Sequence, residues 1–196
     1  MLHIIDDEDV LRDALLWLAQ SRAIPAKAYS KAKDFLTHLE QHFEFASEGD
    51  CILLDVRMAE MSGTTLFNLL TEKQLTQRLP VIFLTGHGDV PMAVDTLKRG
   101  AFDFFEKPFN DNALMDRVQE ALASSIQAGL AHQVQARLQT LSQREHEVLK
   151  LILQGKLNKI IADELTISLR TVEVHRANIF HKMQIKSAIE LAGILK

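Results

Sequence analysis

The most informative stretch of the sequence is Cys51-Ile52-Leu53-Leu54-Asp55, an apolar run that ends in a carboxylate. Such a run, with no polar alternation, is typical of a strand that is buried on both faces of a sheet. Four further segments are interpreted as strands, each followed by a helical pattern, and they are residues 2–6, 23–29, 80–85 and 101–105. This alternation predicts a five-stranded, doubly wound parallel α/β sheet with helices on both faces.

The rest of the chain has only helical patterns. Residues 124–140 are rich in Ala, Gln and Leu, but Ser124-Ser125 and Gly129 interrupt them, so we expect the preceding helix to give way to a partly helical linker. Four short helices are expected beyond it, at residues 143–153, 159–166, 169–183 and 187–195. The predicted organisation is a sheet domain at 1–122, a linker at 123–140 and a small all-α domain at 141–196.

Composition and charge exclude several classes of protein. Apolar residues make up 47% and charged residues 24% of the chain, which is unlike a disordered protein. No apolar run reaches the roughly 18 residues of a membrane span and residues 1–7 turn acidic, so we expect a cytoplasmic protein with no membrane contact. The single cysteine, Cys51, excludes an internal disulfide and argues against a thiolate zinc site. The net charge is −7 over residues 1–140 and +3 over residues 141–196, which favours a polyanionic partner for the C-terminal part.

Polar residues follow several of the predicted strands. Because parallel strands end at the same edge of a sheet, we expect a common site formed by Asp6, Asp7, Asp55, Thr85 and Lys107. Three clustered carboxylates repel one another and need a cation, and Mg²⁺ prefers such oxygen ligands. A carboxylate such as that of Asp55 can attack a phosphoryl group, while Lys107 and Thr85 can stabilise the transferred group.

This set of residues, with Pro108 after Lys107, resembles the receiver domain of bacterial two-component response regulators over residues 1–122. The resemblance implies a flavodoxin-like fold and phosphorylation of Asp55 by a sensor histidine kinase. It implies that Mg²⁺ is held by Asp6, Asp7, Asp55 and the main-chain carbonyl of Arg57. The chain departs from the family pattern at Ala59, where a proline is usual.

The resemblance also suggests how phosphorylation acts. Thr85 and Phe104 are similar to the switch pair of receivers, in which the hydroxyl moves toward the phosphoryl group and the ring turns inward. The surface of the fourth helix and fifth strand would then change, and the protein would form a homodimer. We interpret His87, in the loop after Thr85, as a solvated residue.

The C-terminal part contains a helix, a turn and a second helix at residues 158–165, 166–168 and 170–179, a spacing typical of a helix-turn-helix. The periodicity of the second helix predicts a core-facing side made by Val172, His175, Ile179 and Met183. The opposite side would enter the major groove of double-stranded DNA, and it holds Glu173, Arg176, Ala177 and Phe180. We expect contacts with DNA phosphates from Lys159, Thr171, Lys182 and Lys186.

Two motifs, Asn158-Lys159-Ile160-Ile161-Ala162 and Thr171-Val172-Glu173-Val174-His175, are similar to the LuxR-type DNA-binding domain of the NarL/FixJ class of response regulators. The loop and helix at residues 86–94 and the segment at residues 170–178 resemble the FixJ branch. The resemblance implies a transcriptional regulator that is switched by phosphorylation. The resemblance also implies RNA polymerase as a partner. It implies that the chain is not an enzyme, except that it catalyses its own phosphorylation and dephosphorylation.

Two alternatives remain at this stage. A phosphatase that used Asp55 as its nucleophile would usually carry a second acid two residues later, but that position is Arg57. A DNA-binding regulator with a vestigial, phosphorylation-independent receiver is the stronger alternative, and the complete set of receiver residues argues against it.

Overall fold

The computed structural model describes residues 1–41, 43–86 and 90–195, and for residues 90–93 it describes only the backbone. The described chain divides into two compact units, Met1–Gly129 and Leu130–Lys196. Each unit has its own hydrophobic core. His87, the loop residue singled out above, lies outside the described residues.

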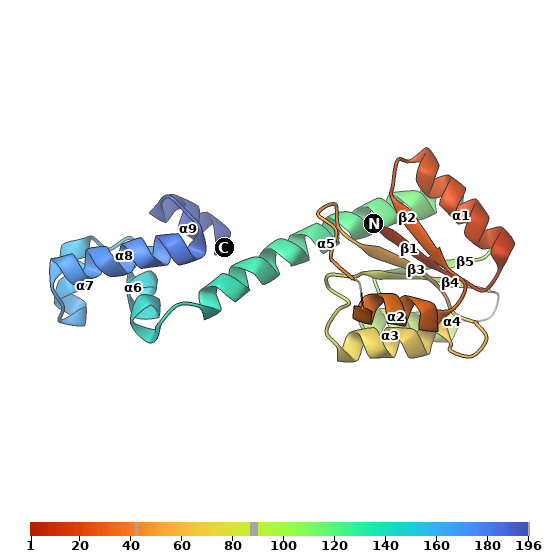
Figure 1. Cartoon of the computed structure of the whole chain (residues 1–196), viewed down its shortest axis with the longest axis horizontal. Helices are drawn as coiled ribbons and strands as arrows, with labels where there is room; N and C mark the ends of the chain where they lie inside the picture. Colours follow the sequence, from red (N-terminus) through yellow and green to blue (C-terminus); the bar gives the residue numbers. More distant parts are fainter. Residues whose placement is uncertain (42, 87–89, 196) are drawn as a thin grey trace. The chain divides into compact units, whose positions relative to one another are not determined.

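The first unit is a five-stranded parallel sheet (Figure 1). Its strands are β1 (Leu2–Ile5), β2 (Ala26–Tyr29), β3 (Cys51–Asp55), β4 (Val81–Thr85) and β5 (Asp103–Glu106). They are ordered β2-β1-β3-β4-β5. After β1 the chain adds β2 on one side and then returns to add β3, β4 and β5 on the other side, so the switch point of the topology lies between β1 and β3. The helices that connect and follow the strands are α1 (Asp9–Ser21), α2 (Ala32–Gln41), α3 (Gly63–Glu72), α4 (Val90–Lys98) and α5 (Asp111–Gln139). The predicted fold class is confirmed.

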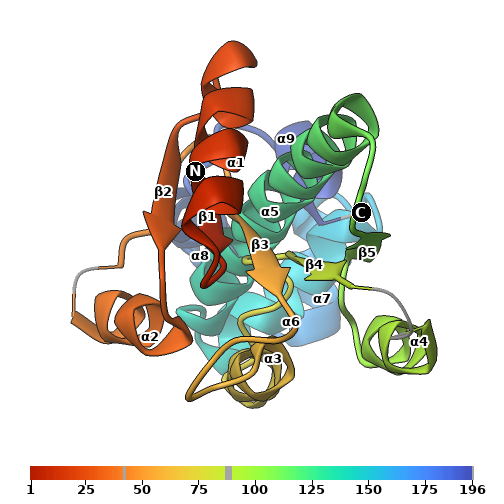
Figure 2. The same ribbon diagram turned by 90° about the vertical axis from the view of Figure 1, so that its right-hand side faces the viewer.

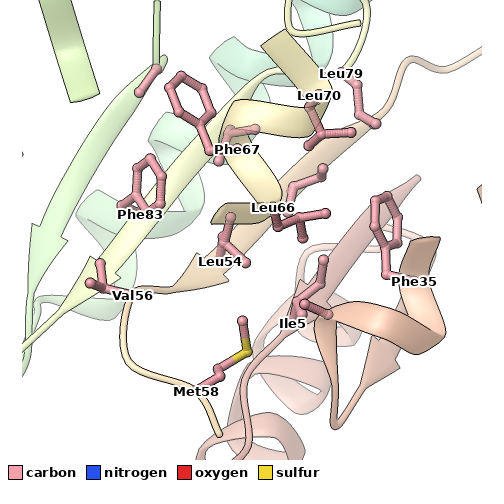
Figure 3. Close-up of a cluster of buried hydrophobic side chains, with 14 of the residues drawn as sticks. Ile5, Phe35, Leu54, Val56, Met58, Leu66, Phe67, Leu70, Leu79 and Phe83 are labelled. Carbon is pink, nitrogen blue, oxygen red and sulfur yellow. The ribbon is translucent and has the colours of Figure 1, made fainter. Parts of the chain in front are cut away.

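Both faces of the sheet are covered, which explains the solid apolar strands. Successive strand residues point to opposite faces. Cys51 and Leu53 therefore pack with α1 and α5, whereas Ile52 and Leu54 pack on the other face with α2 and α3. Figure 3 shows the second of these clusters, with Leu54 and Phe83 of the sheet meeting side chains of the covering helices. In Figure 2 helices flank the strands on both sides.

The end of the sheet domain differs from the sequence prediction. The expected helix and partly helical linker are one continuous helix of 29 residues, α5. Ser125 does not break it, because this buried side chain is a polar bridge: its hydroxyl donates to the Arg78 carbonyl at 2.6 Å and accepts from the Asp50 N–H at 2.9 Å. A single helical glycine such as Gly129 costs only about 1 kcal/mol relative to alanine, which a long helix tolerates.

The second unit is helical. After the end of α5 it contains α6 (Gln143–Leu153), α7 (Asn158–Leu165), α8 (Leu169–Met183) and α9 (Ala188–Ile194). Serine side chains cap three of these helices at Ser142, Ser168 and Ser187. Thr166 ends α7 in the left-handed conformation, with φ of 55°, and so produces the turn into α8. In the part of the chain that the model describes, no helix is long and apolar enough to span a membrane.

Candidate functional site

The predicted acidic residues meet at the carboxyl edge of the sheet. Asp55 ends β3 and Asp6 follows β1, and both side chains are almost fully buried. Lys107, just after β5, reaches between them: its Nζ lies 2.6 Å from Asp55 Oδ1 and 2.9 Å from Asp6 Oδ2. The structure therefore brings together three of the predicted residues, from the ends of β1, β3 and β5, although β4 lies between β3 and β5 in the sheet.

Main-chain N–H groups hold the carboxylates in place. The Glu8 N–H donates to Asp6 Oδ1 at 2.8 Å, and the Arg57 N–H donates to Asp55 Oδ2 at 2.8 Å. The exposed Asp7 accepts a hydrogen bond from the Ala59 N–H at 3.1 Å. The loop before α3 is thus fastened to two of the acids, even though Ala59 occupies the position where a proline was expected.

Burial and charge pairing shift the pKa values of Asp55 and Lys107. Burial raises the pKa of Asp55 above its ordinary value, and the hydrogen bond and charge of Lys107 oppose this effect only in part. Burial alone would lower the pKa of Lys107, but its bonds to Asp55 and Asp6 outweigh burial and raise it. Lys107 is therefore a firmly protonated cation placed against the carboxylate that is the candidate nucleophile.

Gly63 is a residue of this site that was not predicted from the sequence. A Cβ atom at this position would lie 2.1 Å from the main-chain oxygen of Asp55, which is far inside contact distance. The Gly63 N–H also donates to the Val56 carbonyl at 3.0 Å. Helix α3 can approach the end of β3 this closely only because residue 63 has no side chain.

Thr85 and Phe104 lie on the same side of the site as Lys107. Thr85 ends β4 and is buried, and its hydroxyl donates to the Gly86 carbonyl at 3.2 Å. Its main-chain oxygen accepts from the Lys107 N–H at 2.7 Å, so the ends of β4 and β5 are joined. Phe104 is half-buried and packs against the core that faces α2 and α3.

The donor set suits a hard divalent cation. Asp6, Asp7 and Asp55 supply carboxylate oxygens, which Mg²⁺ prefers. Within the described residues, however, no three acidic, imidazole or thiol groups already converge as a metal-binding cluster. The Lys107 ammonium bridges Asp6 and Asp55 instead.

In the second unit, α7, the Thr166 turn and α8 form a helix-turn-helix. Ser168 caps α8 by accepting from the Thr171 N–H at 3.0 Å. The predicted core side is buried at Val172, Ile179 and Met183, with His175 half-buried. On the outer surface, side chains are exposed at Lys159, Glu173 and Ala177.

Two predicted DNA contacts have other partners. Phe180 is not on the free face of α8, because its ring packs against the core of the unit and lies 5.4 Å from the guanidinium of the half-buried Arg176. Lys182 donates to Glu145 at 2.7 Å and to the Thr140 carbonyl at 3.1 Å. Both side chains therefore help to hold the unit together, and their contacts with DNA stay predictions.

Several exposed residues of α8 were assigned to neither side, and Val174 is one of them. Val174 is 52% exposed, although it is apolar and β-branched. Its neighbours on that side are Glu173, Ala177 and Asn178, which are also exposed. An apolar side chain on such a surface can meet a thymine methyl group in the major groove. The signal that could have identified it is its position between Arg170 and Asn178, four residues from each on one helix face.

The sheet with its acidic edge and the separate helix-turn-helix define a class of protein in which a regulatory domain precedes a DNA-binding domain. Residues 2–119 match the family model described as "Response regulator receiver domain", and residues 139–195 match "Bacterial regulatory proteins, luxR family".

Relatives match nearly the whole chain. The C4-dicarboxylate transport transcriptional regulatory protein DctR of Rhodobacter capsulatus is 45% identical over 97% of this chain and 96% of its own length. The transcriptional regulatory protein FixJ of Rhizobium meliloti is 40% identical over 95% of this chain and 90% of its own.

Two solved structures have the same organisation. The response regulator StyR superposes with a TM-score of 0.71 at 34% identity and covers 99% of this chain and 96% of its own. Full-length FixJ from B. japonicum superposes with a TM-score of 0.59 at 37% identity. The match covers 98% of this chain and 94% of the FixJ chain. The chain belongs to the NarL/FixJ class of two-component response regulators, with a receiver domain and a LuxR-type DNA-binding domain.

Proposed function

We propose that this chain is a transcriptional regulator whose receiver is phosphorylated on Asp55 by a sensor histidine kinase. The observation that carries the proposal is the 2.6 Å contact between Lys107 Nζ and Asp55 Oδ1 at the edge of the sheet. An ammonium at this position stabilises the negative charge of a phosphoryl group that is transferred to Asp55. In the transfer, an Asp55 oxygen forms a bond to phosphorus, and the bond between phosphorus and the donor nitrogen of the kinase histidine breaks.

Bound Mg²⁺ would neutralise charge on the transferred phosphoryl oxygens. Asp6, Asp7, Asp55 and the main-chain carbonyl of Arg57 would hold it. Thr85 lies at the end of β4, and its hydroxyl donates to the Gly86 carbonyl. If the hydroxyl gives up this hydrogen bond, it can donate to the phosphoryl group instead. Phe104 would follow Thr85 and alter the surface of α4 and β5, which favours a homodimer. Phosphorylation can shift this equilibrium only by the amount that it stabilises the dimer more than the monomer.

We further propose that the dimer presents two α8 helices to DNA half-sites about one helical turn apart. Glu173, Arg176 and Ala177 would face the bases. Thr171 and Lys159, near the beginnings of α8 and α7, would contact phosphates. RNA polymerase is the expected partner once the dimer is bound to a promoter.

The first test is labelling of the full-length protein with acetyl phosphate and Mg²⁺. The wild type should be labelled, Asp55→Asn should not, and Asp34→Asn, which changes an exposed acid on α2, should behave as the wild type. Labelling of Asp55→Asn at the wild-type rate would refute the assignment of the acceptor.

The second test separates a working receiver from a vestigial one. Light scattering with Mg²⁺ and beryllofluoride, which mimics the phosphoryl group, should show a change from monomer to dimer that Asp55→Asn abolishes. A dimer under all conditions would instead support the vestigial, phosphorylation-independent alternative. Turnover of a phosphate ester would support the phosphatase.

A further inference from the structure

Arg12 is a charged residue of α1 that is not part of the phosphoryl site, yet it contacts the site's main chain. Its side chain is only 14% exposed. One guanidinium nitrogen, Nη1, donates to the main-chain carbonyl of Asp6 at 2.7 Å. The other, Nη2, donates to the carboxylate of Asp9 in the first turn of the same helix. The guanidinium thus connects the end of β1 to the beginning of α1.

The segment that Arg12 spans holds two of the proposed Mg²⁺ ligands, Asp6 and Asp7. The N-cap residue of α1 is Glu8, which the structure describes, and its side chain makes no capping hydrogen bond to that helix. Arg12 supplies a side-chain connection between this turn and the helix, where a capping residue would otherwise do so. A planar guanidinium suits this role, because two of its N–H groups can bind two oxygens at once.

We propose that Arg12 is a positioning residue for Mg²⁺ binding: by holding the Asp6 carbonyl and Asp9 together, it fixes the turn that presents the Asp6 and Asp7 carboxylates. The inference rests on the proposed function, because it takes these acids as metal ligands. Groups that orient metal ligands without touching the metal commonly contribute 10- to 100-fold to metal affinity.

The test is calorimetric titration of MgCl₂ into the full-length chain, with the melting temperature of each metal-free variant measured alongside. Arg12→Ala should weaken Mg²⁺ binding about tenfold, near the lower end of the range for such groups. Arg12→Lys should lie between Arg12→Ala and the wild type, because an ammonium can bind one of the two oxygens but cannot span both in the same geometry.

Arg22→Ala is the matched control. Arg22 follows α1 at its other end and pairs with Asp116 at 2.9 Å and Asn112 at 2.9 Å, far along the helix from the acidic edge. Its loss removes an ion pair of α1 and should leave Mg²⁺ affinity unchanged, even if both alanine variants melt at a lower temperature. A second readout is amide exchange at residues 6–9, which should be faster in Arg12→Ala alone.

The outcomes separate the inference from the function on which it rests. If the wild type and Arg12→Ala bind Mg²⁺ equally, or if Arg22→Ala weakens binding as much as Arg12→Ala, the positioning role is wrong and the proposed function stands. If the wild type takes up no Mg²⁺, the proposed metal site is wrong and the inference is overturned with it.

Discussion

Replacing Glu145 with glutamine tests what holds the DNA-binding unit together. Glu145 is 3% exposed in the first turn of α6. Its Oε2 accepts from the Ser142 N–H at 2.8 Å and from Lys182 Nζ at 2.7 Å, and the Glu145 N–H donates to Ser142 Oγ at 3.2 Å. One side chain therefore closes the capping box of α6 and also binds the last turn of α8.

The size of the effect follows from which of these bonds survives. Glutamine retains an oxygen for the Ser142 N–H, so the capping box is kept and the ionic contact with Lys182 is lost. A hydrogen bond to a charged group contributes about 1.5–3 kcal/mol. Lys182 is 35% exposed and water can replace part of this contact, so we expect a loss of about 1–2 kcal/mol. Glu145→Ala also removes the capping box, which adds about 1 kcal/mol.

The contribution of Glu145 to stability should depend on pH in a definite direction. Burial raises the pKa of Glu145, but the bonds from Lys182 and the Ser142 N–H outweigh it and hold the pKa below its ordinary value. The folded unit therefore favours the ionised carboxylate. This contribution is complete above the unfolded pKa of about 4.3 and is lost as the pH falls through the lower folded pKa. Glu145→Gln has no carboxylate to protonate, so its stability deficit should shrink toward low pH.

The assay is hydrogen exchange of the full-length chain, expressed as protection factors at pH 7 and pH 4. Amides of α6 and α8 should lose about five- to thirtyfold in protection at pH 7, which corresponds to 1–2 kcal/mol, while amides of β1 and β3 serve as an internal control. Glu147→Gln is the matched variant, since this half-exposed partner of Arg144 lies on the same helix and should cost at most about 1 kcal/mol. Unchanged protection in α6 and α8 of Glu145→Gln would refute the reasoning.

Three further changes have clear expected results. Gly63→Ala forces a Cβ to within 2.1 Å of the Asp55 carbonyl and should destabilise the sheet unit by at least about 1–3 kcal/mol in urea unfolding, whereas Gly193→Ala, which meets open space, should not. Val174→Ala should weaken DNA binding at a thymine position by about 1 kcal/mol in a base-substitution series without changing the salt slope, and a uniform loss would contradict base contact. Ser125→Ala removes the buried hydroxyl that joins α5 to two loops and should cost about 1–3 kcal/mol in thermal unfolding, so an unchanged melting temperature would refute the bridge.

The sheet could be predicted from the sequence because its strands are buried on both faces. A strand such as β3 must then be apolar throughout, and the acid that follows the apolar run marks the carboxyl edge. The same geometry predicts that residues after different strands meet, and Asp6, Asp55 and Lys107 do so. The position of Gly63 against the Asp55 carbonyl could not be predicted, because it depends on how closely α3 packs on the end of β3.

The helical part shows where periodicity is insufficient. Serine favours helix ends because its hydroxyl competes for main-chain groups, which is why Ser125 was taken as an interruption. Here the hydroxyl binds groups outside its own helix, and α5 continues. Likewise, the periodicity of α8 identifies its fully buried side. For residues at the boundary of that side, such as Phe180 and Lys182, the contacts depend on which helices pack beside α8, and this cannot be read from periodicity.

The geometry of the acidic edge also limits how a phosphoryl group can alter the receiver. Both carboxylate oxygens of Asp55 already have partners, Lys107 Nζ at one and the Arg57 N–H at the other. A phosphoryl group on either oxygen must displace or recruit one of these donors. If the phosphoryl group recruits Lys107, a movement of this residue should also move the end of β4, because the Lys107 N–H donates to the Thr85 carbonyl at 2.7 Å. The proposed switch residue Thr85 is therefore linked to Lys107 through the main chain, in addition to the contact proposed between its hydroxyl and the phosphoryl group, and the ends of β4 and β5 should respond together.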